Sequence, residues 1–454
     1  MNTKALFNER EIFKKPFLLF SPFLLLSVIF VIISYDPSFF GDESKYLNYA
    51  INILKGYYSP PFPNIYLATG PGYPLILVPF VAFKIPYIGI ALLNAIFYYI
   101  SIVLLYKTLK LIVTLRLALI VSLFWAFYYN SYDNLQYILS ESVAPFLISA
   151  LMYFLVKMNN TILIFKNKYI YLAGFTLGYL ALTKIIFGYV LLFMFAGNCL
   201  VWLFNRSSIN YRKGLMVLTV AFLTTLPYLV YTYHLTAKVF YWGSVGGNNM
   251  YWMSTPYEKE YGSWFPEPKQ NTDSIVSLKT YSEFRQEEYN NVISNGQNIP
   301  GFEEYIWKNH RLDFVEINKY KGVEKDEMLK RIAINNIREH PVKYLENCLS
   351  NLGRILFNYP YTYKLQNPGT LLRIPPNVII LALLLFSLFS TILNWKKIIF
   401  PIRFTIFIFL LYMGGSITGS AEIRMFTVIV PILLLWISFI LNRTLRISWR
   451  FEEK

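Results

Sequence analysis

The feature that most constrains this chain is a series of apolar runs that each approach the thickness of a membrane. A helix needs about 20 residues to cross about 30 Å of hydrocarbon. Charged residues make up only 15% of the 454 residues, against about 25% in a soluble domain. The sequence therefore predicts an all-α, polytopic membrane protein, a helical bundle with about ten transmembrane helices. The runs lie near residues 17–35, 86–106, 112–129, 142–157, 169–183, 185–204, 214–233, 374–394, 398–416 and 423–441.

Basic residues are concentrated in alternate short loops and at both ends of the chain. Because Lys and Arg accumulate on the cytoplasmic side of a membrane, this pattern places both termini in the cytoplasm. It also explains the net charge of +16 as contacts with anionic membrane lipid, without nucleic acid as a partner. The residues on that side include Lys14, Lys15, Lys107, Lys110, Arg116, Lys157, Lys168, Lys213, Lys396, Lys397, Arg403 and Arg443.

Two polar segments interrupt the apolar runs and are predicted to lie outside the cytoplasm. Residues 36–85 form a first outer loop, whose proline-rich part is too broken for a spanning helix. Residues 234–373 form a larger, partly helical insert, because apolar residues recur at helical spacing over 323–357. The insert divides the membrane part into residues 1–233 and 374–454.

Several common catalytic motifs are absent from the sequence. It contains no phosphate-binding glycine loop, no dinucleotide-binding glycine pattern and no Asp-x-Asp pair for a nucleotide sugar. His234, His310 and His340 are not spaced as metal ligands on a helix, and we expect His310 and His340 at the surface of the insert. Cys199 and Cys348 cannot supply a disulfide framework. These absences disfavour ATP-driven, cytosolic nucleotide-sugar and histidine-zinc chemistry.

A few ionisable residues are predicted to gather at the outer membrane face. Each has a structural explanation, such as a helix-capping acid or a snorkelling cation. Together, however, they combine cations that can hold a lipid phosphate with a carboxylate that can take a proton from an acceptor hydroxyl. These residues are Asp42, Glu43, Glu141, Lys184, Glu422 and Arg424.

The motifs around these charges resemble the family 39 glycosyltransferases, the membrane group that includes protein O-mannosyltransferases and lipid A aminoarabinose transferases. The resemblance covers about residues 17–204 and the last apolar run. It rests on Asp42-Glu43, Tyr46, Ala50, Leu54 and Gly56, then Gly70-Pro71-Gly72-Tyr73-Pro74-Leu75, Ser140-Glu141, Gly174-x-x-x-Gly178 before Leu182-Thr183-Lys184, and Glu422-x-Arg424 before Pro431.

This resemblance implies a GT-C fold, an active site at the outer leaflet, a polyprenyl-phosphate sugar donor and inversion at the anomeric carbon. It gives Asp42 the catalytic role with Glu43 beside it, and Lys184 and Arg424 the lipid phosphate. The chain has Arg424-Met425-Phe426 where many members have Arg-Tyr, and its insert matches no module of the family. The acceptor is therefore open, whether glycan, lipid or protein.

Further assignments at this face stay open. Glu141, Tyr46, Tyr73 and Glu422 are candidates for an acceptor site or for a structural role. A divalent cation, Mg or Mn, would be held by Asp42 and Glu43 if the reaction uses one, because hard cations take carboxylate oxygens.

Two other functions compete with a glycosyltransferase. An O-antigen ligase or polymerase would place essential Arg or His residues in the large outer loop. A transporter or flippase of lipid-linked glycans would place ionisable residues near mid-membrane, in paired broken helices. The charges at one face of this chain favour the transferase.

Overall fold

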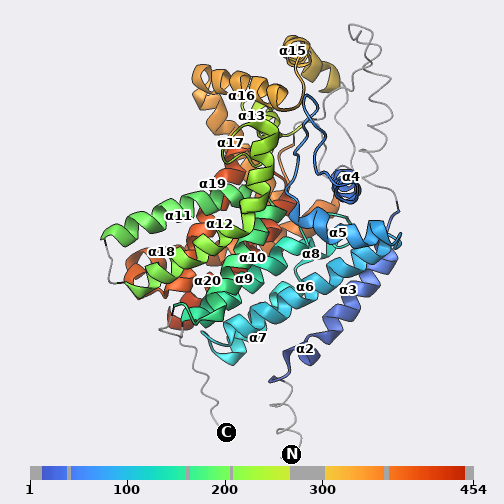
Figure 1. Ribbon diagram of the computed structural model, residues 1–454. Helices are drawn as coiled ribbons and strands as arrows, with labels where there is room; N and C mark the ends of the chain where they lie inside the picture. The colour runs from blue at the N-terminus through green and yellow to red at the C-terminus, as the bar shows by residue number, and fades with distance from the viewer. Residues whose placement is uncertain are drawn as a thin grey trace, which may run out of the picture.

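A computed structural model describes residues 13–37, 42–159, 164–204, 208–265, 302–361 and 368–444. Predictions that fall on residues 38–41 of the first outer loop, on 266–301 of the insert and on the two ends of the chain lie outside this part. The described residues form α-helices and short 3-10 helices, and no strand occurs among them. A long bundle of helices is capped at one end by a smaller helical group (Figure 1).

Each predicted apolar run forms a helix. Six of these helices are long and apolar enough to cross a membrane, so the chain is a polytopic membrane protein. The first run is broken between α2 and α3, where Pro22 occupies the first turn of α3. The helices are α2 (Pro16–Leu19), α3 (Ser21–Ser34), α6 (Ile88–Leu109), α7 (Leu115–Ala126), α9 (Val143–Asn159), α10 (Lys168–Thr183), α11 (Ile186–Phe204), α12 (Ile209–Thr236), α18 (Ile374–Leu393), α19 (Phe400–Thr418) and α20 (Ile423–Thr444).

Helix α20 is the central helix of the bundle. All its residues from Phe426 to Ile440 are buried, and it packs on α7, α9, α18 and α19. Because α20 is apolar on every side, it needs protein neighbours all around it. Its first turn carries Arg424, so the packing of α20 fixes the position of this cation.

The glycine pair of α10 allows a close approach to α12. A Cβ atom at Gly174 would lie 2.7 Å from the Val217 carbonyl oxygen, and one at Gly178 would lie 2.6 Å from the Ala221 carbonyl oxygen. Real Cβ atoms do not come so close, so only glycine allows these backbones to meet. The Gly174-x-x-x-Gly178 spacing therefore serves the packing of α10 on α12.

We expect Gly178→Val to destabilise the protein by about 1–3 kcal/mol, because the added side chain must push α12 away from α10. The matched control is Gly197→Val in α11, since a Cβ there meets nothing within 4 Å. Thermal unfolding in detergent, followed by tryptophan fluorescence, measures both variants. Equal transition temperatures for the two would contradict the close packing.

The first outer loop contains two helices and an extended stretch between them. These are α4 (Glu43–Leu54) and α5 (Gly72–Ala82), and α8 (Tyr129–Asp133) lies in a later loop. With 11 residues, α5 is about 16 Å long, too short to cross the hydrocarbon. This agrees with the expectation that the proline-rich loop holds no spanning helix.

The capping group is built from the insert. It comprises α13 (Gly246–Met253), α15 (Phe302–Ile317), α16 (Gly322–Glu339), α17 (Pro341–Phe357) and the 3-10 helix η1 (Pro368–Arg373); a further 3-10 helix, η2 (Trp395–Lys397), joins α18 to α19. The predicted helical stretch 323–357 forms two helices, because Pro341 begins a new helix after His340. Residues Tyr251, Trp252, Phe265, Ile306, Phe314, Ile317 and Leu329 form a separate core.

One histidine prediction is confirmed and the other is wrong. His340 is exposed between α16 and α17, but His310 has only 1% of its surface exposed. Its Nδ1 lies 2.6 Å from the Tyr251 hydroxyl and its Nε2 lies 2.8 Å from Glu260 Oε2. A buried polar ring needs such partners. They come from residues 59 and 50 positions away, which helical spacing does not reveal.

Candidate active site at the start of helix α20

Four segments that are distant in the sequence meet where α20 begins. Asp42 precedes α4, Glu141 lies just before α9, Lys184 directly follows α10, and Arg424 lies in the first turn of α20. Lys184 has an extended backbone conformation between α10 and α11, so its side chain emerges at the break between two helices. The predicted site residues Asp42, Glu141, Lys184 and Arg424 are therefore brought together.

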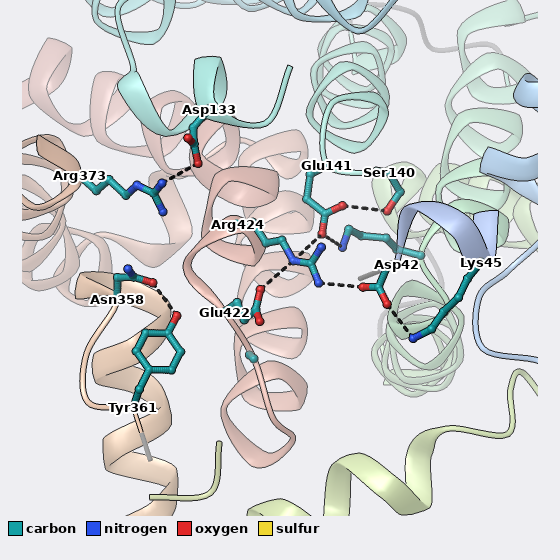
Figure 2. A network of polar contacts seen from close by, with 12 residues as sticks. Asp42, Lys45, Asp133, Ser140, Glu141, Asn358, Tyr361, Arg373, Glu422 and Arg424 are labelled. Atoms are coloured by element: carbon teal, nitrogen blue, oxygen red, sulfur yellow. Dashed lines mark hydrogen bonds and ion pairs between the residues drawn. The ribbon is translucent and has the colours of Figure 1, made fainter. Parts of the chain in front are cut away.

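Ion pairs link these side chains into one group, which we name the charge cluster. Arg424 Nη2 lies 2.8 Å from Asp42 Oδ2, and Arg424 Nε lies 3.0 Å from Glu422 Oε2. Lys184 Nζ lies 3.1 Å from Glu141 Oε1. Opposite charges alternate through the group (Figure 2). Its members are Asp42, Lys45, Glu141, Lys184, Glu422 and Arg424.

Lys45 was not among the predicted site residues. Its Nζ donates a hydrogen bond of 2.9 Å to Asp42 Oδ1, so each carboxylate oxygen of Asp42 has a cationic partner. Residues three apart on a helix lie on the same face. The spacing of Asp42 and Lys45 at the start of a helix was therefore a local signal that could have identified this cation.

Glu43 faces away from its neighbour Asp42. Its Oε1 accepts a 2.7 Å hydrogen bond from the Ile138 amide, and its side chain is buried. Consecutive residues on a helix point in different directions, so the two carboxylates reach different surroundings. Glu43 ties the start of α4 to the loop that carries Glu141.

The described residues contain no group of three or more His, Cys, Asp or Glu side chains that could hold a metal ion. Both oxygens of Asp42 already contact Lys45 and Arg424. The predicted pair of Asp42 and Glu43 does not form a joint ligand set in this arrangement, and we derive no step through a metal.

Tyr46 and Tyr73 are both buried. The Tyr46 hydroxyl lies 3.1 Å from Ser140 Oγ, and Ser140 Oγ donates a 3.3 Å hydrogen bond to Glu141 Oε2. The hydroxyl proton of Tyr46 is then directed to Ser140. The two tyrosine rings meet edge to face with centroids 5.0 Å apart, which fixes the ring of Tyr46. This placement favours the structural role over contact with an acceptor.

The glycines of the first outer loop bring it against the end of α10. A Cβ atom at Gly72 would lie 2.7 Å from the Thr183 amide nitrogen, and one at Gly70 would clash with the Leu182 carbonyl. Only glycine permits this backbone contact. The motif Gly70-Pro71-Gly72 thus holds the loop beside Lys184, which joins two landmarks of the family resemblance in space.

Asn351 of α17 is a second residue that the sequence prediction missed. Its amide nitrogen donates to the carbonyls of Ser416, Ile417 and Gly419, and its Oδ1 accepts from the Ala421 amide. The buried amide thereby fixes the loop that leads into Glu422 and Arg424. An asparagine within an amphipathic helix gave no local signal of this role, because its partners lie about 65–70 residues away.

The charge cluster changes the acidity of its two best-connected carboxyl groups. Burial alone would raise the pKa of Asp42, but the charges of Arg424 and Lys45 outweigh it and lower the pKa below its usual range. Burial likewise opposes ionisation of Glu141, whose pKa is nevertheless lowered by Lys184 and Arg424. Both carboxyl groups are therefore ionised at neutral pH.

These shifts predict how stability depends on pH. Ordinary pKa values are about 3.9 for Asp and 4.3 for Glu, and a carboxyl whose folded pKa is lower stabilises the fold above those values. That contribution is lost as the pH falls below about 4 toward the folded pKa. We expect the unfolding temperature of Asp42→Asn to decrease less steeply below pH 4 than that of the parent protein. Parallel curves in a thermal-unfolding series from pH 7 to 3 would contradict the lowered pKa.

Comparisons with known proteins give resemblances at the level of fold. ArnT from Cupriavidus metallidurans bound to undecaprenyl phosphate matches 93% of this chain and 77% of its own, with 11% identity and a TM-score of 0.39. The oligosaccharyltransferase AglB from Archaeoglobus fulgidus, in complex with an inhibitory peptide and a dolichol-phosphate, matches 95% of this chain and 50% of its own, with 13% identity and a TM-score of 0.47.

The chain spans about half the length of AglB. No protein-family model matches the chain, and no curated protein does so. At this identity the chemistry has to be inferred from the charge cluster itself.

Proposed function

We propose that this protein is an inverting glycosyltransferase that moves a sugar from a polyprenyl-phosphate donor to an acceptor hydroxyl. The observation that carries the proposal is the direct contact between the carboxylate of Asp42 and the guanidinium of Arg424, with Lys184 and Glu141 beside them. A base and two cations then lie within reach of one reacting centre. One general base and two phosphate-binding cations are the groups that displacement of a phosphate from a sugar requires.

Arg424 and Lys184 are proposed to bind the donor phosphate. A guanidinium presents paired N–H donors that match phosphate oxygens, and the ammonium adds a second positive charge. Negative charge accumulates on the phosphate as the bond from the anomeric carbon to the phosphate oxygen breaks. The two cations stabilise this charge more strongly in the transition state than in the bound donor.

Asp42 is proposed to act as the general base. The acceptor oxygen attacks the anomeric carbon from the face opposite the phosphate, its proton passes to Asp42, and polyprenyl phosphate leaves with the bonding electron pair. The carboxylate is suited to this position because one third of its side chain, 33%, stays exposed. Attack from the opposite face inverts the anomeric configuration.

The ion pair of Asp42 with Arg424 suggests an order of events. In the resting protein the charge of Arg424 helps to lower the pKa of Asp42, which makes the carboxylate a weak base. A donor phosphate that contacts Arg424 shares this charge, so the basicity of Asp42 rises when the donor binds. Donor binding thereby prepares the base.

The topology belongs to the same proposal. We propose that both termini lie in the cytoplasm and that the charge cluster lies at the outer face of the cytoplasmic membrane. The insert, residues 234–373, separates the membrane segments 1–233 and 374–454 and is proposed to contact the acceptor. Its α17 already holds the loop before Arg424 through Asn351.

A donor-turnover assay tests the function. Purified protein in detergent is given a panel of polyprenyl-phosphate sugars, each with candidate hydroxyl acceptors, and release of free polyprenyl phosphate is measured. We expect one donor to be consumed with the formation of one new glycosidic bond per phosphate released. Binding of lipid-linked sugar without any turnover across the panel would instead support a flippase.

A further inference from the structure

A second charged site lies at the opposite end of the bundle from the charge cluster. A cavity of about 250 Å³ is found where α2, α6 and α9 meet. Helix α9 begins two residues after Glu141 and carries Lys157 in its last turn. Because α9 has 17 residues, the cavity and the charge cluster are separated by about 25 Å along this helix.

All the charged residues that line this cavity are lysines. They are Lys14, Lys107, Lys110 and Lys157, which alternate with the aromatic residues Tyr106 and Tyr153. In the described part of the chain, no carboxylate forms an ion pair with Lys107, Lys110 or Lys157. Lys107, Lys110 and Lys157 therefore concentrate positive charge that no carboxylate of the described residues neutralises.

Two of the ammonium groups lie close to the same aromatic ring. Lys107 Nζ lies 5.7 Å and Lys157 Nζ lies 5.8 Å from the centre of the same Tyr153 ring. Lys107 also lies 5.2 Å from the centre of the Phe17 ring. Like charges repel, so two ammonium groups close to one ring favour a negatively charged ligand near them.

The apolar surroundings indicate what kind of anion fits. Leu111 lines the cavity with 40% of its surface exposed, and Phe17 beside it is 52% exposed. Exposed apolar side chains next to a basic cavity suit a ligand that combines a phosphate with hydrocarbon chains. Lysines in this position also follow the charge pattern of the cytoplasmic membrane face, where anionic lipids are abundant.

We propose that this lysine cavity binds the phosphate of an anionic membrane phospholipid. Lys107 and Lys157 contact the phosphate, Lys110 and Lys14 add charge at the rim, and the acyl chains lie along Phe17 and Leu111. The same lysines could accept a free phosphate ion, which shares this chemistry but lacks the acyl chains. The lipid assignment depends on the apolar rim.

The test compares lipid binding by two pairs of lysine substitutions in the full chain. K107Q/K157Q removes the two ammonium groups close to the Tyr153 ring. K396Q/K397Q removes two exposed lysines of η2 on the same predicted membrane side. Native mass spectrometry and thermal unfolding in mixed micelles measure the binding of phosphatidylglycerol, with phosphatidylcholine as the neutral comparison. Inorganic phosphate and glycerol phosphate are titrated in parallel.

We expect phosphatidylglycerol to bind K107Q/K157Q about 25-fold more weakly than the parent, since each lysine adds about fivefold at a membrane surface. K396Q/K397Q and the charge-conserving K107R/K157R should keep the parent affinity, which shows that a folding defect is not responsible. Equal affinity of both glutamine pairs would overturn the proposal. Stabilisation by inorganic phosphate equal to that by the lipid would overturn the lipid assignment.

Discussion

Asp42→Asn is expected to reduce donor turnover about 1,000-fold, because the amide cannot accept the proton of the acceptor hydroxyl. Donor binding should persist, since Arg424 and Lys184 are unchanged. The fold should persist as well, because Arg424 keeps Glu422 at 3.0 Å and Glu141 at 3.7 Å. Release of polyprenyl phosphate under saturating donor measures turnover, and binding of a non-transferable donor analogue measures affinity.

Glu422→Gln is the matched control for this substitution. It also removes a carboxylate partner of Arg424, but the Glu422 side chain is 45% exposed and carries no role in the proposed proton transfer. We expect its turnover to stay within about threefold of the parent, as for an exposed ion pair. Comparable losses in both variants would mean that Asp42 acts only by holding Arg424. Near-normal turnover of Asp42→Asn would exclude it as the base.

Arg424→Gln is expected to reduce kcat/KM for the donor about 100-fold or more, because it removes a donor of hydrogen bonds and charge to the leaving phosphate. Arg424→Lys should fall between this variant and the parent, since an ammonium keeps the charge but not the paired N–H groups. In this variant Asp42 keeps its ion pair with Lys45, and Glu141 keeps its ion pair with Lys184. Neither carboxylate is therefore left without a cationic partner. Steady-state kinetics over a range of donor concentrations measures the effect.

Arg373→Gln provides the comparison for a structural ion pair. Arg373 Nη2 contacts Asp133 Oδ2 at 2.7 Å, separately from the charge cluster (Figure 2). Loss of this ion pair should lower the unfolding temperature, with a smaller effect on kcat/KM. Similar kinetic losses for Arg373→Gln and Arg424→Gln would show that the donor phosphate is not held specifically by Arg424.

The Arg424→Gln variant also tests whether donor binding raises the basicity of Asp42. If donor binding raises the basicity of Asp42 by engaging Arg424, then Arg424→Gln should remove the dependence of the Asp42 pKa on donor. The acid limb of kcat, which reports the pKa of the donor-bound protein, would then lie at the same pH as the acid limb of kcat/KM, which reports the pKa of the free protein. Distinct limbs in this variant would contradict the coupling between donor and base.

Local sequence patterns were sufficient to predict the helices and most residues of the charge cluster. Apolar runs form helices because a chain in lipid must satisfy its own backbone hydrogen bonds. Asp42, Glu141, Lys184 and Arg424 were found because each lies at the end of such a run, and helix ends on one side of a membrane bring such residues to one surface. The spacing of Gly174 and Gly178 is likewise a local pattern, typical of membrane helices that pack closely.

The partners of those residues required the tertiary structure. Glu43 was paired with Asp42 because they are adjacent in sequence, yet its Oε1 contacts the Ile138 amide. His310 was expected at the surface, yet Glu260 and Tyr251 enclose it. The orientation of a side chain around a helix and the packing of distant segments decide such contacts, and neither is encoded in local spacing.

The sequence by itself thus determined the membrane helices and the charges at their ends, because hydrophobic burial and helix length act over about 20 neighbouring residues. Only the tertiary structure decided that Arg424 meets Asp42 across 382 positions, and that Asn351 holds the loop before it. Contacts of this kind depend on how the whole bundle packs around α20.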